Sequence, residues 1–135
     1  MKESLRYIAQ VTLVVKEYDD AIEFYTRKLG FALLKDEKLN ASKRWVVVAP
    51  KGKSGCHLLL AKAANEKQKQ AIGNQSGGRV FMFITTDSFW KDYQKMLEAG
   101  VRFKESPREE EYGTVVVFED LYGNLWDLVE PTSKQ

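Results

Sequence analysis

The sequence predicts an α+β fold made of two tandem modules, each with the element order strand, helix, strand, strand, strand (βαβββ). Three observations support this prediction. The length of 135 residues fits a single domain. Short β-rich runs alternate with apolar residues at helical spacing. The second half of the chain also repeats the first at an offset of 70 positions, since VTLVV begins at residue 11 and FMFIT at residue 81.

The repeat covers several pairs of segments at this one offset. VTLVV aligns with FMFIT, the helix-ending LGF with AGV, WVVVAP with VVVFED, and CHLLL with WDLVE. No insertion separates these pairs, so we interpret the repeat as a duplication. Module one then covers about residues 8–61 and module two about residues 78–131 of one domain spanning residues 1–135.

Module one is expected to begin with a strand at residues 11–15. A helix over residues 19–29 follows, because apolar residues recur along it at helical spacing, an aspartate can cap its first turn, and Gly30 ends it. The β-rich runs after the helix predict strands at residues 31–34, 44–49 and 57–60.

Module two repeats this order. Residues 80–85 predict a strand, and residues 88–99 predict a helix that Gly100 ends. Strands are expected at residues 101–104, 114–118 and 125–129. Between the modules, AKAANEKQKQAIG predicts a connecting helix and NQSGG a loop. The acidic segment PREEEYG, residues 107–113, is expected to be a solvated loop.

Composition and charge exclude several function classes. Lys and Arg number 21 against 19 Asp and Glu, so the net charge of +2 gives no reason to expect nucleic acid as a partner. No apolar run is long enough to cross a membrane, and no signal-peptide stretch follows the first residues. A single cysteine, Cys56, excludes an intrachain disulfide and a cysteine-based zinc site. We therefore expect a cytoplasmic protein.

The repeat also selects candidate site residues. Side chains alternate between the two faces of a strand, so equivalent positions in the two modules face the same side. Gln10 aligns with Val80, and His57 aligns with Asp127. The modules, placed side by side, can share a curved sheet around a cleft. We expect Gln10, His57 and Asp127 to border that cleft, which is the natural place for a ligand.

Two segments resemble a known family. QVTLVVKEYDDAIEFYTRKLGF, from residue 10, and FEDLYGNLWDLVEP, from residue 118, are similar to the vicinal oxygen chelate superfamily of glyoxalase I, bleomycin-resistance proteins and extradiol dioxygenases. The likeness runs from about residue 8 to residue 131. It implies a curved sheet around a cleft with the helices on its outer face, a small-molecule ligand, and a homodimer that covers the open sheet.

The resemblance also implies a possible cofactor, one divalent metal ion. Metal-dependent members carry ligands early in the first strand and late in the last strand of each half, which here are Gln10, His57, Val80 and Asp127. Val80 has no donor atom, and Asp127 is one methylene shorter than the usual glutamate. Gln10, His57 and Asp127 are therefore the metal ligands that the resemblance implies, with an incomplete set.

Three further residues are candidates for substrate binding. Trp45 and Tyr112 are aromatic residues near strand starts beside polar loops, where either could line the cleft. Arg79 stands next to Val80, and it could pair with Asp127 or receive an anionic ligand, as could Arg44. The alternative for both arginines is an ordinary solvated surface position.

Two functions of different classes stay open on the sequence alone. One is metal-assisted lyase or isomerase chemistry on a substrate that chelates the metal through adjacent oxygens, as in glyoxalase I. The other is metal-independent binding and sequestering of a drug or metabolite. The histidine and carboxylate favour the first, whereas Val80 favours the second. A single histidine disfavours an extradiol dioxygenase, and a structural or regulatory domain with a vestigial cleft is a third possibility.

Overall fold

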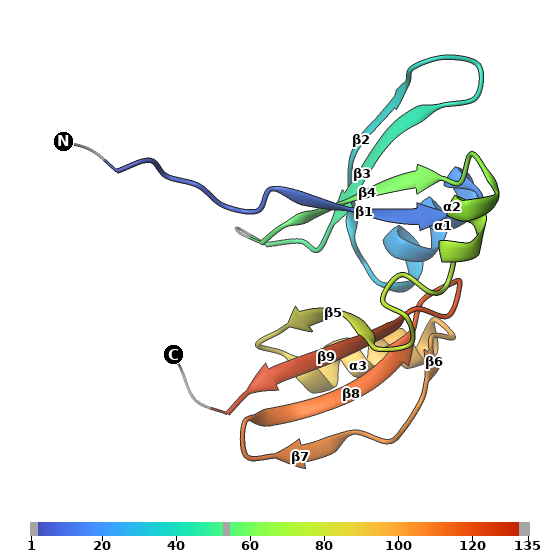
Figure 1. Ribbon diagram of the computed structural model, residues 1–135. Coiled ribbons are helices and arrows are strands. Elements are labelled where there is room, and N and C mark those ends of the chain that lie inside the picture. The colour runs from blue at the N-terminus through green and yellow to red at the C-terminus, as the bar shows by residue number, and fades with distance from the viewer. Residues whose placement is uncertain (1–2, 53–54, 133–135) are drawn as a thin grey trace.

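The computed structural model describes residues 3–52 and 55–132, and it shows two modules, each with its own sheet and helix (Figure 1). Module one consists of β1 (Gln10–Val15), α1 (Tyr18–Glu23), the π-helical turn η1 (Phe24–Lys28), β2 (Ala32–Lys38), β3 (Arg44–Ala49) and β4 (His57–Lys62). The element order is the predicted one, and the α+β fold class is confirmed.

Module two follows a short connecting helix, α2 (Glu66–Ala71), whose first turn is capped by the Asn65 side chain accepting from the Gln68 amide at 2.9 Å. The module consists of β5 (Val80–Thr85), α3 (Phe89–Glu98), β6 (Arg102–Phe103), β7 (Arg108–Glu110), β8 (Gly113–Glu119) and β9 (Leu125–Pro131). The connecting helix and the second main helix both lie where the sequence predicts them.

The two sheets have the same topology. Sheet A has the strand order β1-β4-β3-β2 and sheet B the order β5-β9-β8-β6, with β7 also paired to β8. In each sheet the first strand pairs in parallel with the last. The curved sheet expected across both modules is not formed within one chain: among the described strands, β1 and β5 each pair with a single neighbour and end their sheets.

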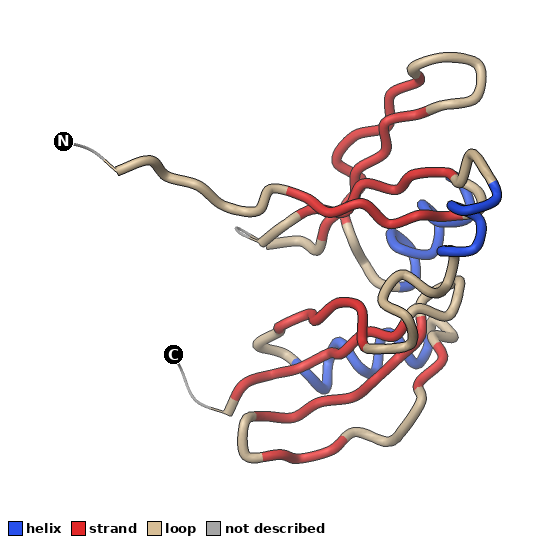
Figure 2. Tube along the Cα trace, in the orientation of Figure 1, coloured by secondary structure: helices blue, strands red, loops and turns tan. Residues whose placement is uncertain are grey.

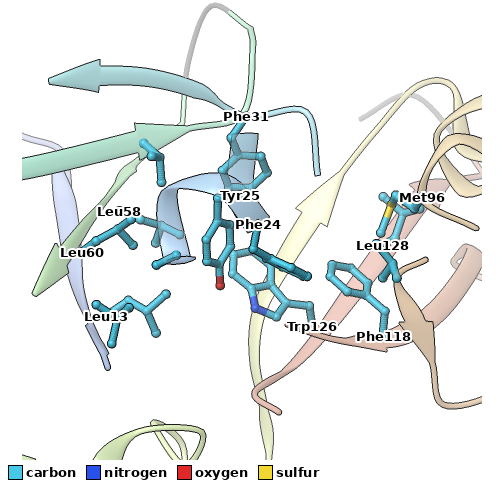
Figure 3. Packing of buried hydrophobic residues seen from close by; sticks show 14 of the residues in the cluster. Leu13, Phe24, Tyr25, Phe31, Leu58, Leu60, Met96, Phe118, Trp126 and Leu128 are labelled. Atoms are coloured by element: carbon cyan, nitrogen blue, oxygen red, sulfur yellow. The ribbon is translucent and has the colours of Figure 1, made fainter. Parts of the chain in front are cut away.

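The hydrophobic core is continuous across the modules (Figure 3). Tyr25 and Phe31 of module one pack against Trp126 of module two, with ring centroids 5.9 and 6.2 Å apart. The Tyr25 hydroxyl donates to Asp120 Oδ2 at 2.7 Å, and both groups are buried. This packing fixes the position of one module relative to the other.

The first helix differs from the prediction in its last turn. It begins at Tyr18, and residues 24–28 form a π turn in which the Leu29 amide donates to the Phe24 carbonyl at 3.2 Å, five residues back. The wider turn lets Phe24 and Tyr25, which are sequence neighbours, both lie in the core. Gly30 then ends the helix with a positive φ of 75°, as predicted.

The prediction of a solvated loop for the acidic segment, residues 107–113, is wrong in part, because residues 108–110 form strand β7. Arg108 pairs with Glu105 at 3.0 Å and also with Glu110, which neutralises part of the negative charge. With its charges paired, the segment forms a strand on β8, with Arg108 opposite Val115.

Two parts of module one project from the molecule. Residues 3–9 run away from both sheets without regular secondary structure, and the outer half of the β2–β3 hairpin stands clear of the core (Figure 2). None of the helices in the described ranges has the length and apolarity needed to cross a bilayer.

Candidate functional site

A pocket of about 850 Å³ lies between the two modules. Module one supplies its wall from the start of β2, the β3–β4 loop and the start of β4, and module two supplies β5 and Trp126. The apolar lining includes the aromatic residues Phe31, Phe83 and Trp126. A cleft between two repeated units is a common place for a ligand.

Phe83 is the most exposed of the aromatic residues in this pocket, with 66% of its surface open to solvent. It lies on the face of β5 that points away from the core, whereas Met82 and Ile84 pack against the core cluster. Trp126, in contrast, is buried, and its ring stacks on Phe118 with the centroids 6.0 Å apart. The pocket therefore combines a rigid aromatic residue with one that a ligand can cover.

His57 is the one predicted site residue that lines the pocket. It is the exposed first residue of β4, and its backbone amide donates to the Ala9 carbonyl at 3.0 Å. Cys56 precedes it and also lines the pocket, where it is half-buried.

Gln10 lies beside His57, as its partner in the parallel pairing of β1 with β4. The corresponding pair in module two is Val80 with Leu125 instead of Val80 with Asp127, and a bulge between Val80 and Met82 shifts the register of β5 against β9 further. Asp127 consequently lies opposite Phe83. The offset of 70 aligns Asp127 with His57 in the sequence, but the two residues are not equivalent in the sheets, because His57 pairs with Gln10 and Asp127 does not pair with Val80.

Asp127 has an unusual environment. Its Oδ1 atom is buried and has no hydrogen-bond partner among the residues that the structure describes. Burial raises the pKa of the Asp127 carboxyl above its ordinary value, nearby Arg108 lowers it, and Glu105 raises it further. This carboxyl can take a proton readily, or accept from a donor or cation that reaches it.

The proposed metal ligands do not assemble into a complete metal site within one chain. Gln10 and His57 belong to sheet A, and Asp127 belongs to sheet B. Across residues 3–52 and 55–132, no three His, Cys, Asp or Glu side chains are grouped so that they could hold a metal ion. The donor set of a single chain thus does not fit a divalent cation.

The three candidate substrate-binding residues lie at separate places outside the pocket lining. Trp45 is half-buried on β3 opposite Glu37, Arg79 is exposed just before β5, and Tyr112 is exposed between β7 and β8. The structure brings none of them next to another.

Arg44 pairs with acidic residues of its own module rather than with Asp127. Its guanidinium binds Asp36 at 2.7 Å and Asp19 at 2.9 Å, and it lies over the Tyr18 ring at 5.1 Å from the centroid. The hydrogen bonds from Arg44 lower the pKa of Asp36. Arg44 therefore ties β2 and β3 to the start of α1.

Sequence reasoning missed most of the pocket residues, among them Phe31, Leu34, Met82 and Phe83. One signal was present: FMFIT has apolar residues on both faces of the strand, where a strand with one solvated face would alternate. An apolar residue on the outer face of β5 indicates a surface with a further role.

Comparison with known proteins identifies the family. The model of the Glyoxalase/Bleomycin resistance protein/Dioxygenase superfamily matches residues 7–128. The chain belongs to this superfamily. It is 54% identical, over 100% of this chain and 98% of the relative, to an uncharacterized protein of Shewanella frigidimarina (strain NCIMB 400). It is 36% identical to the uncharacterized protein YurT of Bacillus subtilis (strain 168), over 91% of this chain and 98% of the relative.

Two solved structures are similar over nearly their whole length. UcmS2 superposes with a TM-score of 0.80 at 27% identity, covering 93% of this chain and 98% of that one. TnmS3, an antibiotic binding protein from Streptomyces sp. CB03234, superposes with a TM-score of 0.76 at 25% identity, covering 97% of this chain and 100% of that one.

Proposed function

We propose that this superfamily member binds a small organic molecule in the pocket between its modules, without a metal ion and without chemical turnover. The observation that carries the proposal is the pocket itself. Its volume of about 850 Å³ lies in the range of ligand sites, and aromatic and aliphatic side chains form most of its wall. The similarity to TnmS3, an antibiotic binding protein, supports the same class of function.

The lining indicates the chemistry of the ligand. Phe83 and Trp126 offer ring surfaces on which a flat or apolar molecule can pack. His57 and Lys51 also line this pocket, and their polar side chains can bind an oxygen-bearing or anionic substituent of the ligand. We therefore expect an aromatic or polycyclic ligand with a polar edge.

Binding of the fluorescent probe 8-anilinonaphthalene-1-sulfonate tests this proposal. We expect saturable binding at one probe per chain. Phe83→Ala should weaken the binding by about threefold to tenfold, the value of one aromatic contact. Trp90→Ala is the matched control, because Trp90 is an aromatic residue of comparable exposure that does not line the pocket.

Two results would overturn the proposal: binding that does not saturate, or an equal effect of Phe83→Ala and Trp90→Ala. Both side chains are more than half exposed, so both variants should fold. Thermal unfolding of each variant checks that point.

Asp127 favours a second candidate function, metal-assisted lyase or isomerase chemistry. Its buried Oδ1 without a hydrogen-bond partner among the described residues is the kind of atom that a cation satisfies. Gln10 and His57 lie side by side but on the other sheet. This candidate therefore requires a second copy of the chain to bring the two sheets together.

The proposal includes a homodimer in the cytoplasm. Large hydrophobic side chains are exposed in both modules, and β1 and β5 end their sheets in the part of the chain that the structure describes. Two-fold pairing would cover both features in each copy. The free thiol of Cys56 is compatible with a reducing compartment.

A further inference from the structure

The connector that runs from module one to module two, residues 63–79, contains a residue that is hydrogen-bonded to both modules (Figure 1). Gln75 follows α2 and is half-buried. Its side-chain amide accepts from the Val14 amide at 3.3 Å, and it donates to the Val14 carbonyl at 3.4 Å and the Ala71 carbonyl at 2.6 Å. Its backbone amide donates to Asn124 Oδ1 at 3.1 Å. Val14 belongs to β1 and Asn124 precedes β9, so Gln75 joins the two sheets.

The bonds to Val14 use the outer edge of sheet A. The Ala63 amide, directly after β4, donates to the Val15 carbonyl at 2.9 Å, so the backbone of Val15 points toward β4. Successive residues of a strand point their amide and carbonyl groups to opposite edges. The backbone of Val14 therefore points away from β4, and the Gln75 side-chain amide pairs with both of its polar groups, as a neighbouring strand would.

On the side of module two, Gln75 joins a buried hydrogen-bond network. Asn124 donates to both carboxylate oxygens of Asp120, through its side chain and its backbone amide, each at 2.9 Å. Both residues are buried. Asp120 Oδ2 also accepts from the Tyr25 hydroxyl at 2.7 Å and from the Trp126 indole at 3.5 Å. The network thus runs from β1 through Gln75 to Trp126, which lines the ligand pocket.

A second contact holds the connector against the turn before β9. Gly73 has a positive φ of 75°, and a Cβ there would overlap the Tyr122 carbonyl. The Tyr122 hydroxyl accepts from the Glu17 amide at 3.2 Å and donates to the Glu17 carbonyl at 3.4 Å, just before α1. The backbone two residues before Gln75 therefore packs on module two, while the same turn reaches back to module one.

The ligand pocket depends on how the modules are placed, because its walls come from both. Phe31 and His57 line it from module one, and Phe83 and Trp126 line it from module two. A change in the angle between the modules changes the distance between these walls. A gap of about 0.5–1 Å already loses a quarter to a half of a van der Waals contact. A small movement of one wall therefore weakens ligand binding.

We propose that Gln75 is a positioning residue for the ligand pocket: by bonding to Val14 and Asn124 it holds sheet A against the turn before β9 and sets the separation of the two pocket walls. Gln75 does not line the pocket itself. It acts through Asn124 and Asp120, which hold the Trp126 indole. The inference rests on the proposed ligand pocket, and it adds the connector to the determinants of that site.

Binding of 8-anilinonaphthalene-1-sulfonate to Gln75→Ala measures the effect on the pocket, at a temperature where circular dichroism shows the variant folded. The packing of Tyr25 on Trp126 does not involve Gln75, so the variant should fold. We expect the dissociation constant of the probe to rise at least about threefold. Gln70→Ala is the matched control, because Gln70 is an exposed glutamine of α2, and it should leave the value unchanged. A smaller rise, or an equal rise in the control, would overturn the inference.

The distance between the modules is a second readout, which separates positioning from a general loss of stability. Nitroxide labels are attached through p-acetylphenylalanine in place of Lys35 on β2 and Lys91 on α3, two exposed residues in different modules. Labelled chain is diluted with unlabelled chain, so that double electron–electron resonance measures distances within one chain. We expect Gln75→Ala to shift or broaden the distance distribution, and Gln70→Ala to leave it unchanged. Weaker probe binding with an unchanged distribution would contradict the positioning role.

The outcomes also separate this inference from the function on which it rests. Saturable probe binding that Phe83→Ala weakens and Gln75→Ala does not would defeat the positioning role and leave the ligand pocket standing. A natural sequence that binds no probe would defeat the pocket and the inference together. Weaker binding and an altered distance distribution in Gln75→Ala alone would support both.

Discussion

Asp127 is the residue whose chemistry the structure changes most. The sequence suggested a possible metal ligand at a position equivalent to His57, and the structure shows a carboxylate opposite Phe83 with one buried oxygen that lacks a partner among the described residues. A buried acceptor without a partner costs about 1–3 kcal/mol. A half-buried carboxyl with a raised pKa is a candidate group for binding or chemistry.

This environment predicts a pH dependence. Because burial raises the pKa of Asp127 in the folded state, the folded protein holds this proton more tightly than the unfolded chain does. The contribution of the protonated Asp127 carboxyl to the free energy of unfolding is fully present below the unfolded pKa of about 4. It is lost as the pH rises through the higher pKa of the folded state. Asp127→Asn should therefore raise the melting temperature at pH 7 by about 2–4 °C.

The advantage of Asp127→Asn should disappear as the pH approaches 4, the ordinary carboxyl range. Differential scanning calorimetry of both proteins at several pH values measures it. Asp87→Asn is the control, since Asp87 is an exposed aspartate outside the sheets. An advantage that grew toward acid pH would contradict the assignment.

At the scale of elements, turns and strand starts were less predictable than the helices and strands themselves. Two glycines at such positions show the reason, because the same residue type serves a different structural need at each. Gly113 begins β8 with a φ of 155°, and a Cβ there would overlap the Glu130 carbonyl across the sheet. Gly123, in the turn before β9, has a φ of 98° but open space where a Cβ would stand. One glycine is required for close approach of two strands, the other only for its backbone conformation.

The two glycines give a matched comparison. Gly123→Ala should cost about 1–2 kcal/mol, the penalty of a left-handed residue with a Cβ. Gly113→Ala should cost clearly more, because the strands β8 and β9 must also move apart. Urea unfolding monitored by circular dichroism measures both. Equal losses would show that the sheet relaxes around residue 113 without strain.

At the scale of the whole molecule, the two candidate functions predict different responses to metal ions. If Gln10, His57 and Asp127 bound a metal, the metal would stabilise the folded protein and raise its melting temperature with concentration. Val80 has no donor atom at the fourth ligand position, and Asp127 lies opposite Phe83, so the ligand set is incomplete whether one copy or two supply it. We therefore expect no change in melting temperature on adding Mn²⁺, Ni²⁺, Zn²⁺ or Mg²⁺ to chelator-treated protein.

Thermal unfolding with each ion is the measurement, with His57→Ala and Asp127→Asn beside the natural sequence. A rise that depends on metal concentration and vanishes in both variants would contradict the expectation and establish the lyase-type function as the better one. Loss of this rise at acid pH would support that reversal, because protons compete with a metal ion for its ligands.

Much of the fold could be predicted because it is written in local patterns. The strand VTLVV, the helix-ending Gly30 and Gly100, and the connecting helix each depend on residues within a few positions. The internal repeat extended these patterns to the order of two modules. The π turn η1 escaped prediction, since it forms to bring Phe24 and Tyr25 into a core made by distant residues.

The sequence by itself determined the family, the α+β class and the order of elements, because short-range propensity and the repeat specify them. Only the tertiary structure decided which residues meet. The register of β5 against β9 placed Asp127 opposite Phe83 and not opposite Val80, and the packing of Trp126 on Tyr25 and Phe31 set the modules so that His57 and Phe83 line one pocket. Strand register and module packing depend on many contacts between residues far apart in the chain, and a local sequence pattern does not specify these contacts.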